Sequence, residues 1–286
     1  MNDLTVSAIV LGAAFLHACW NALVKAHQDP VLTMGLVSGV VMLISAGIML
    51  VAPAPPLALW PYLLLGVVTH NGFKVFLLLA YRTGDLSRVY PLARGSAPLL
   101  VALFSGVVAG EALTWMDLAS VLLISLGLMS LALERGLTVR GLAASDDRRG
   151  LWYALASGTC IAAYTLIDGM GVRLSGTVWG YSAWLFFVDA IPFMLIALVW
   201  RGRYLRQFLR GRVAPGVLAG SLSGLAYFIV MWALNHGAMA PVAALRETGV
   251  VFAALIGTVV LGESFGVRRI LAAALVATGV VVMNLG

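Results

Sequence analysis

Residues 94–111, RGSAPLLVALFSGVVAGE, and residues 246–263, RETGVVFAALIGTVVLGE, repeat one pattern at a distance of 152 positions. Each copy begins with an arginine, continues as a mostly apolar run and ends in Gly-Glu. The same shift places Gly127 on Gly279, in the apolar segment that follows each copy. Single matches mean little, but an aligned arginine, Gly-Glu pair and glycine across two segments indicate an internal duplication.

The composition of the chain is that of a membrane protein. Of its 286 residues, 62% are hydrophobic and 10% are charged, and the mean hydropathy is +1.00. Soluble proteins carry roughly a quarter charged residues, so this chain lacks the polar residues that a soluble surface needs. Hydropathy in windows of membrane-span length finds ten apolar segments of about 20 residues. They cover residues 4–24, 31–52, 58–81, 88–108, 116–133, 151–172, 178–200, 214–235, 239–261 and 267–285.

These ten segments are expected to be helices. Backbone amides in lipid must be paired within their own segment, and the alternating pattern of an outer-membrane barrel is absent. The duplication assigns residues 1–135 to a first five-helix repeat, 136–149 to a linker and 150–286 to a second repeat. An odd number of helices inverts the second repeat relative to the first, as in many secondary transporters. The sequence therefore predicts an all-α integral membrane protein with ten transmembrane helices, arranged as two inverted five-helix repeats around a central cavity.

Basic residues are distributed unequally between the two sides of the predicted membrane. Of the 18 Lys and Arg residues, 14 fall in loops after odd-numbered segments, and only Arg173 falls on the opposite side. The 14 residues are Lys25, Arg82, Arg88, Arg135, Arg140, Arg148, Arg149, Arg201, Arg203, Arg206, Arg210, Arg212, Arg268 and Arg269. By the positive-inside rule their side is cytoplasmic, so both termini are predicted to be periplasmic or extracellular in a multi-pass protein of the cytoplasmic (inner) membrane. The net charge of +6 is thus a topology signal, and nucleic acid is not an expected partner.

Two further segments bear on topology. The first apolar segment lacks the basic n-region of a signal peptide, because its only nearby positive charge, Lys25, follows the apolar run. We expect it to remain as the first helix. Residues 201–212 combine arginines with apolar residues on one helical face, which fits either an interfacial helix on anionic headgroups or a plain basic loop.

The sequence contains no recognisable catalytic or metal-binding motif. Cys19 and Cys160 lie inside apolar segments, where a thiol behaves as a small core residue. CxxC pairs, His/Cys ligand clusters and GxxxxGK[ST] loops are absent from the sequence. The stretch Gly220-Ser-Leu-Ser-Gly224 does not fit the G-x-S-x-G pattern of a serine nucleophile, and with Gly216 it forms a GxxxGxxxG strip for close helix packing. We expect no metal, no cofactor and no enzymatic activity.

Six charged residues lie inside the predicted spans away from the span ends, and they are the strongest candidates for function. The cations are Lys74, Arg94 and Arg246, and the acids are Asp168, Asp189 and Glu247. A charge at a helix centre costs at least about 2.5 to 3.5 kcal/mol on insertion scales, so each should face protein, water or an opposite charge. The six can neutralise one another as structural ion pairs, or an arginine can bind a substrate carboxylate while an acid binds an amine. Arg246 and Glu247 point about 100° apart on a helix, so they are not expected to pair with each other.

Aromatic, histidine and proline residues inside the spans complete the candidate site. Aromatic rings can form the apolar wall of a pocket, whereas four tryptophans near span ends fit an interfacial belt. These four are Trp60, Trp115, Trp152 and Trp179. The prolines, which could line a pocket, act as hinges or only kink the packing, are Pro91, Pro98, Pro192 and Pro241. His17 and His70 lie within helices, where a lone histidine is more often structural than a proton carrier.

The predicted site consists of two groups of residues. The substrate-binding candidates are Trp20, His70, Lys74, Tyr90, Arg94, Tyr164, Trp184, Tyr227, Trp232, Arg246 and Glu247. The proton-coupling candidates are Asp189 and Glu247.

Four motifs occur in a characteristic order along the chain. They are His17-Ala-Cys-Trp20-Asn21-Ala-Leu-Val-Lys25, Tyr90-Pro91-Leu92 with Pro98, Gly110-Glu111 and Gly262-Glu263. Together with the ten-helix layout, they resemble the EamA-type members of the drug/metabolite transporter superfamily over essentially the whole chain. The resemblance implies an exporter of amino acids or other small metabolites. It also implies a central cavity surrounded by the first, third, fourth, sixth, eighth and ninth helices, with the fifth and tenth at the periphery.

The sequence thus predicts a secondary transporter that exports amino acids or similar small zwitterionic metabolites by alternating access. Its partners would be the lipid bilayer and a small-molecule substrate, and it would be a monomer or a weak oligomer. Two alternatives stay open: a transporter of another solute class (nucleotide sugar, organic anion or cationic drug), and a non-transporting membrane scaffold. An intramembrane enzyme acting on lipid would need a convergent nucleophile and base, which the sequence does not offer.

Overall fold

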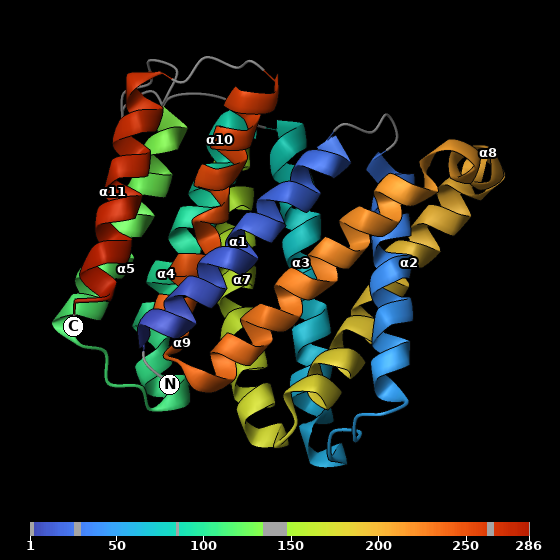
Figure 1. Cartoon of the computed structure of the whole chain (residues 1–286), viewed down its shortest axis with the longest axis horizontal. Helices are drawn as coiled ribbons and strands as arrows, with labels where there is room; N and C mark the ends of the chain where they lie inside the picture. The colour runs from blue at the N-terminus through green and yellow to red at the C-terminus, as the bar shows by residue number, and fades with distance from the viewer. Residues whose placement is uncertain (1–2, 26–29, 84–85, 134–147, 262–265, 286) are drawn as a thin grey trace.

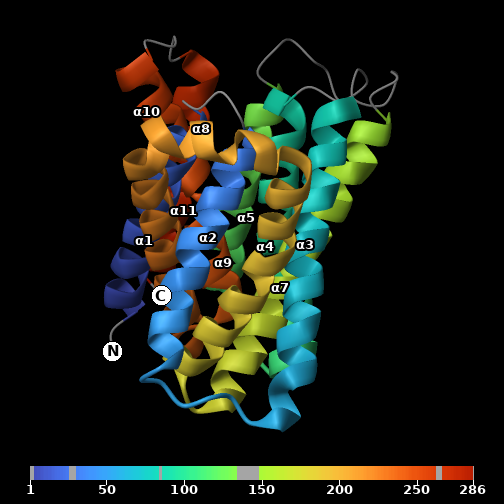
Figure 2. The ribbon, with the colours of Figure 1, turned by 90° about the vertical axis from the view of Figure 1, so that its right-hand side faces the viewer.

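The computed structural model describes residues 3–25, 30–83, 86–133, 148–261 and 266–285, and these residues form an all-helical bundle without strands (Figures 1 and 2). The helices are α1 (Asp3–Lys25), α2 (Pro30–Met49), α3 (Trp60–Thr83), α4 (Leu86–Ala109), α5 (Trp115–Ser130), α7 (Arg148–Ser175), α8 (Val178–His236), α9 (Met239–Glu247), α10 (Gly249–Leu261) and α11 (Val267–Met283), with 3-10 turns at Leu57–Leu59 and Leu131–Leu133. The predicted all-α fold is confirmed. The second Gly-Glu motif, at residues 262–263, and most of the predicted linker lie outside the described residues.

Eight helical stretches in the described part of the chain are long and apolar enough to cross a membrane. Two of them belong to α8: a first arm, Val178–Tyr204, and a second arm, Val213–His236. The other two predicted spans correspond to α5 and α11, which have 16 and 17 residues. At 1.5 Å per residue these helices are about 24 to 26 Å long, shorter than the roughly 30 Å hydrocarbon core. The multi-pass membrane architecture is therefore supported, and two of the ten predicted spans fall short of full length.

Two helix boundaries differ from the sequence prediction. The predicted segments 178–200 and 214–235 are joined by helical backbone throughout, and α8 reverses direction between its two arms (Figure 1). The basic stretch 201–212 is accordingly helical. The predicted segment 239–261 is instead divided at Thr248, whose hydroxyl donates to the Leu245 carbonyl at 2.7 Å. The backbone N–H of Thr248 donates to the same carbonyl, three residues back, at 3.2 Å, so the regular ladder of bonds four residues back is interrupted there.

One end of the bundle holds both chain termini, and the other holds exposed arginines. The chain ends marked N and C in Figure 1 lie on the same side, called here the terminal side. The turn of α8, with the exposed Arg201, Arg203 and Arg210, lies toward the opposite side, called here the basic side. Because successive spans alternate in direction, the C-terminal halves of α1 and α3 and the N-terminal halves of α2 and α4 lie toward the basic side.

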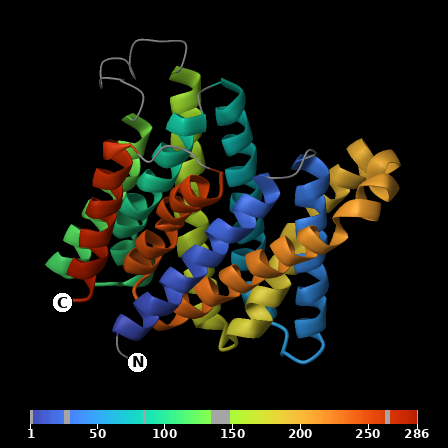
Figure 3. The ribbon, with the colours of Figure 1, turned by 45° about the horizontal axis from the view of Figure 1, so that its top comes forward.

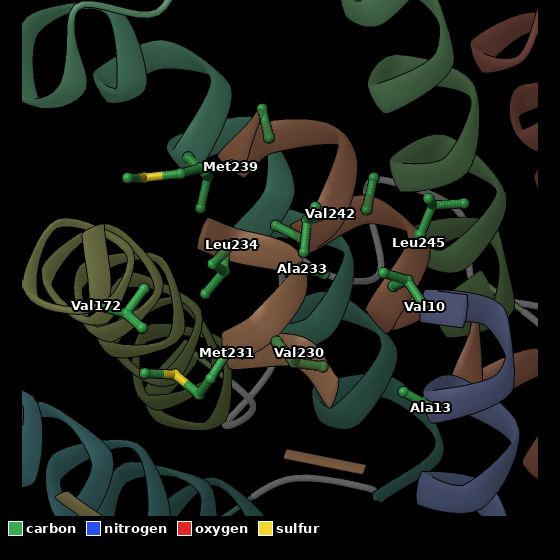
Figure 4. Close-up of a cluster of buried hydrophobic side chains, with 14 of the residues drawn as sticks. Val10, Ala13, Val172, Val230, Met231, Ala233, Leu234, Met239, Val242 and Leu245 are labelled. Carbon is green, nitrogen blue, oxygen red and sulfur yellow. The ribbon is translucent and has the colours of Figure 1, made fainter. Parts of the chain in front are cut away.

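A cluster of buried apolar side chains fills the bundle toward the terminal side. Figure 4 shows Val10 of α1, Val172 of α7, Leu234 of α8 and Met239 of α9 in this cluster, and none of the four is more than 1% exposed. Gly169 leaves room for the Met239 side chain between α7 and α9, since a Cβ there would lie 2.7 Å from the Met239 methyl carbon. This packing closes the terminal side of the bundle.

The predicted glycine strip of α8 packs against α2. A Cβ at Gly220 would lie 2.6 Å from Cβ of Val40 and 3.2 Å from the carbonyl oxygen of Val37. A Cβ at Gly216 would overlap the side chain of Leu36. The expectation that this strip allows close helix packing is confirmed.

The duplicated glycines Gly127 and Gly279 face each other's helix, where α5 and α11 lie side by side at one edge of the bundle (Figures 1 and 3). A Cβ at Gly127 would lie 3.0 Å from the carbonyl oxygen of Ala272, and one at Gly279 would lie 3.0 Å from that of Ser120. Ser120 and Ala272 are themselves 152 positions apart in the sequence. The contact is therefore reciprocal, which is what a two-fold relation between the predicted repeats would produce.

Replacing Gly127 by Val is expected to lower the stability of the protein by about 1 to 3 kcal/mol, the usual range for overpacking. The added methyl groups would meet Val276 and a backbone oxygen of α11, which cannot move aside without shifting the helix. The measurement is the melting temperature in detergent. Gly47→Val is the matched control, because a Cβ at Gly47 would have nothing within 4 Å. Equal melting temperatures for the two variants would contradict the packing argument.

Candidate functional site

A cavity of about 420 Å³ lies between the helices, within the size range of small-molecule sites. Its walls come from α1, α2, α3, α4, α7, both arms of α8 and the end of α9. It extends from the middle of the bundle to Val24 and Tyr81, near the ends of α1 and α3, and so reaches toward the basic side. α5 and α11 contribute no lining residue among those described, as the resemblance implies, whereas α2 and the first arm of α8 add walls that the resemblance does not include.

Two arginines share one glutamate at this cavity. Nη1 of Arg94 donates to Oε2 of Glu247 at 2.8 Å, and Nε of Arg246 donates to Oε1 at 2.9 Å. The Glu247 side chain is fully buried, while the arginine side chains are 8% and 5% exposed and line the cavity. Among the described residues, Nε of Arg94 makes no hydrogen bond, and Nη2 of Arg246 lies 2.8 Å from Oε1 of Glu247 within the ion pair; both nitrogen atoms are buried. With two cations and one carboxylate, the cluster carries a net positive charge.

The expectation that Arg246 and Glu247 would not pair is wrong. Consecutive positions on a helix diverge by about 100°, but that angle describes the Cβ directions. The guanidinium stands at the end of a long flexible side chain and reaches around the helix surface. Glu247 is also the last residue of α9, beyond which the regular helix is interrupted.

Aromatic rings cover both guanidinium groups. Cζ of Arg246 lies 5.3 Å from the ring centre of Tyr164, and Cζ of Arg94 lies 5.2 Å from Tyr90 and 5.8 Å from Phe73. These distances fall within the roughly 6 Å range of cation–π attraction. The rings thus hold the arginines in place and at the same time form apolar walls of the cavity.

His17 is a cavity residue that was not among the predicted binding residues. Nη2 of Arg94 lies 3.2 Å from its Nε2, and Nε1 of Trp20 donates to its Nδ1 at 3.1 Å. Both neighbours are hydrogen-bond donors, and a neutral imidazole can accept through only one nitrogen. Only one of the two contacts can be a hydrogen bond at a time, so His17 does not fully satisfy Arg94.

A second charged pair joins α3 to the first arm of α8. Nζ of Lys74 lies 2.8 Å from Oδ2 of Asp189, and the amide of Asn71 donates to Oδ1 at 2.9 Å. Lys74 also lies 5.1 Å from the ring centre of Phe193. Lys74 and Asp189 both line the cavity and are 21% and 17% exposed. This pair is more accessible than the arginine cluster and is neutral as a whole.

A third pair joins α3 to α7. Nε2 of His70 lies 2.7 Å from Oδ2 of Asp168, and both side chains are buried. The His70 ring stacks on Tyr164, with centroids 4.0 Å apart and planes 12° apart, and Tyr227 tilts against it at 5.5 Å. His70 lines the cavity, whereas Asp168 lies behind it.

The structure brings eight of the predicted substrate-binding residues to the cavity wall. They are Trp20, His70, Lys74, Tyr90, Arg94, Tyr164, Tyr227 and Arg246, and the proton-coupling candidate Asp189 joins them. Three do not line it: Trp184 packs on Trp60 at 5.5 Å, Trp232 stacks on His236 at 4.6 Å, and Glu247 lies behind the arginines. Both tryptophans lie closer to the terminal side, where neighbouring rings and the apolar core occupy them.

The four prolines are absent from the cavity wall described by the structure. Pro91, Pro98 and Pro192 lie inside α4 and α8, and Pro241 lies in the first turn of α9, where a helix tolerates proline without a kink. The interpretation of these prolines as pocket-lining residues is not supported. Among the described residues, no group of three or more His, Cys, Asp or Glu side chains is placed to hold a metal ion.

Three lining residues that the sequence analysis missed, Phe73, Leu77 and Tyr81, lie on a helical stripe of α3. Together with the predicted His70 and Lys74 they recur at spacings of three or four and face the cavity. Starting from the charged Lys74, the 3.6-residue period would have identified this stripe. Phe186 and Phe193 on α8 carried no such signal, because lipid-facing and cavity-facing aromatic residues look alike in an apolar helix.

An ion pair closes the opposite, terminal side. Nη2 of Arg173, at the end of α7, lies 2.7 Å from Oε1 of Glu111, which also accepts from the backbone N of Met239 at 3.0 Å. Arg173 further donates to the carbonyls of Leu234 and Gly237, at 2.8 and 2.7 Å. We call this network the terminal-side latch. It ties the Gly110-Glu111 corner, where Gly110 has a φ of +66°, to the ends of α7, α8 and α9.

Comparison with known proteins gives one family and one fold. Residues 148–285 match the model of the EamA-like transporter family. No curated protein sequence matches the chain. A solved structure, described only as a crystal structure of a protein, superposes with a TM-score of 0.77 over 98% of this chain and 96% of its own length, at 19% identity. That similarity shows that the fold is shared over the whole chain.

Proposed function

Because the second half of this chain, residues 148–285, belongs to the EamA-like transporter family, we propose that the protein is a secondary transporter that exports amino acids or similar small zwitterionic metabolites. Transport by a multi-pass membrane protein follows from the family and from the apolar helices. The zwitterionic substrate, its export and alternating access are the parts that we propose.

The observation that carries the substrate class is the arginine cluster in an aromatic cavity. Arg94 and Arg246 share Glu247, keep a net positive charge and line the cavity. A carboxylate is the ligand that a planar guanidinium binds most specifically, through parallel charge-assisted hydrogen bonds. Phe73, Tyr164 and Tyr227 offer apolar surface beside it. An amino acid with an apolar side chain matches both features.

The ammonium group of such a substrate also finds suitable neighbours. Asp189 lies at the cavity wall, and Asp168 stands behind His70. Aromatic faces add cation–π attraction for an ammonium group. Asp189 is already paired with Lys74, so Asp168 is the acid whose charge is left for an ammonium group, and its separation from the arginine cluster favours a zwitterion over a simple anion or a simple cation.

The arrangement of the cavity supports alternating access. The cavity reaches the basic side, while the apolar cluster of Figure 4 and the terminal-side latch close the other end. In a transporter built from two inverted repeats, exchanging the conformations of the repeats would open the terminal side and close the basic side. The reciprocal contact of Gly127 and Gly279 supports such a repeat relation.

A thermal-shift experiment on the purified protein tests the proposal. A ligand that binds only the folded state stabilises it by about 2.7 kcal/mol at 100 times its Kd. We expect L-phenylalanine to raise the melting temperature. Phenethylamine, which lacks the carboxylate, and 3-phenylpropionate, which lacks the amine, are matched controls that should raise it less.

Other outcomes would favour the alternatives. Stabilisation by 3-phenylpropionate alone would indicate an organic-anion transporter, and stabilisation by phenethylamine alone a cation transporter. Nucleotide sugars belong in the same screen. Absence of stabilisation by every solute class would favour a non-transporting scaffold.

We also propose that both termini are periplasmic or extracellular, because 14 basic loop residues stand against one. Figure 1 agrees with termini on one common side. A reporter enzyme that works only outside the cytoplasm should be active when fused after Gly286, and a reporter that works only in the cytoplasm should be inactive there. The reverse pattern would overturn the orientation.

A further inference from the structure

The three acids buried in the predicted spans differ in the partners that hold them. Glu247 is paired with two arginines, and Asp189 with Lys74 and Asn71. Arginine and lysine stay protonated at physiological pH, so they keep these two carboxylates charged. Asp168 is paired with His70, the only side-chain type that ordinarily gains and loses its proton near neutrality. Of the three, the Asp168 pair is the one that can exchange a proton.

The geometry places this pair so that a proton can reach it from the cavity. His70 lines the cavity and stands between it and Asp168, which is 1% exposed. The stacked Tyr164 ring and the tilted Tyr227 ring fix the imidazole orientation. A proton from the cavity therefore meets the imidazole first and is then shared with Oδ2 of Asp168 at 2.7 Å.

Asp168 also has a side that no partner satisfies. Its Oδ1 is buried without a hydrogen bond among the described residues. A Cβ at Gly66, one turn before His70 on α3, would lie 2.6 Å from this oxygen. The glycine thus leaves room for the carboxylate, but the backbone offers it no donor. A carboxylate with one free oxygen in the interior is less firmly held in its charged form than Glu247, whose two oxygens are both used.

We propose that His70 and Asp168 form the proton-binding site of this transporter, and that a proton and the ammonium group of the substrate occupy it in turn. This inference rests on the proposed function. With its proton, the pair is neutral as a whole. Without it, the pair carries one negative charge, which attracts an ammonium group arriving in the cavity. Substrate leaving in one direction is thereby exchanged for a proton moving in the other.

The charges that face the pair support this exchange. The charged or titratable groups near it are Lys74 on α3, Tyr164 on α7, Tyr181, Asp189 and Tyr227 on α8, and Arg246 on α9. Lys74 and Asp189 neutralise each other. Arg246 belongs to the cluster with net positive charge, which offsets the negative charge of the deprotonated pair. The cavity is then nearly neutral before an ammonium group binds, and an uncompensated buried charge is avoided.

The test uses the full chain in liposomes that contain a fluorescent pH indicator, with the membrane voltage clamped and L-phenylalanine as the probe. Wild-type protein should move protons against the direction of phenylalanine. Asp168→Asn should retain exchange of labelled for unlabelled phenylalanine, while its proton movement falls to the leak of protein-free liposomes. Asp117→Asn is the matched control, since Asp117 caps α5 far from the cavity and should leave proton movement unchanged.

Binding measurements add a readout that a structural role would not change. For one-for-one competition, the apparent Kd of wild-type protein for phenylalanine should rise by up to about tenfold per pH unit on the acidic side of the titration. In Asp168→Asn it should be independent of pH. A pH dependence that is the same in both proteins would overturn the inference.

Measurements on wild-type protein alone also test the inference. A variant that fails to fold therefore does not leave it untested. Phenylalanine transport without proton movement would refute the inference and leave the proposed function intact. Absence of phenylalanine transport would overturn the proposed function and, with it, this inference, so the two failures give different results.

Discussion

Glu247→Gln is expected to lower the melting temperature more than any other single change at the cavity. The substitution removes the only carboxylate that Arg94 and Arg246 share in the described part of the chain. Removing one member of a buried ion pair typically costs about 3 to 5 kcal/mol, because an uncompensated charge stays behind. Here two guanidinium groups would be left in that state. The measurements are the melting temperature in detergent and the yield of monodisperse protein.

Two variants separate the charge effect from a general sensitivity of the site. Glu247→Asp keeps the charge on a shorter side chain, so its melting temperature should lie between those of wild type and Glu247→Gln. Asp189→Asn leaves Lys74 without this carboxylate, but Lys74 is 21% exposed and can remain hydrated. The melting temperature of Asp189→Asn should therefore fall less than that of Glu247→Gln. If Asp189→Asn were as destabilising as Glu247→Gln, the arginine cluster would have no special structural role.

Arg246→Gln is expected to weaken binding of phenylalanine by roughly 10- to 150-fold, which corresponds to the loss of a charge-assisted contact of about 1.5 to 3 kcal/mol. Arg246 lines the cavity, and its guanidinium lies over the Tyr164 ring. Removing it leaves Glu247 paired with Arg94, so the protein should still fold. The measurement is the Kd of the purified variant, with the melting temperature as a check on folding.

Arg94→Gln is the matched comparison, since its position is equivalent under the 152-residue shift. Arg94 reaches Glu247, His17 and two rings, and we expect it to be chiefly structural. Its loss should lower the melting temperature more than the affinity. Unchanged affinity in Arg246→Gln would refute the ligand assignment, and unchanged affinity in both variants would make both arginines structural.

The charged residues of the site could be predicted from the sequence, because a charge inside a membrane span is energetically costly. Lys74, Arg94, Arg246 and Asp189 were singled out because a charge inside a membrane span needs a partner, and all four line the cavity. The pairing itself could not be predicted. Whether Glu247 meets Arg94, 153 positions away, or another cation depends on how α4 and α9 cross, and a local rule about neighbouring residues excluded its contact with Arg246.

The fold, like the site, could be predicted from the sequence only in part. Composition and hydropathy sufficed for an all-helical membrane protein, because lipid allows few alternatives. They did not reveal the continuous α8 or the division at Thr248, since hydropathy does not report where a helix continues through a basic stretch or is interrupted within an apolar one. Trp184 and Trp232 were misplaced for a related reason: an aromatic residue in an apolar helix carries no sign of which neighbour it faces.

The terminal-side latch has a consequence for how fast the protein can work. Opening this side would separate Glu111 from Arg173 and from the start of α9, and Arg173 from the carbonyls that close α8. Each charge-assisted contact broken before its replacement forms adds about 1.5 to 3 kcal/mol to the activation barrier, and every 1.4 kcal/mol slows a step about tenfold. Binding and release of the solute at the cavity would then be fast compared with the opening itself. Under the proposed alternating access, turnover would be limited by this one step, and the same barrier would keep the pathway from leaking while no solute is bound.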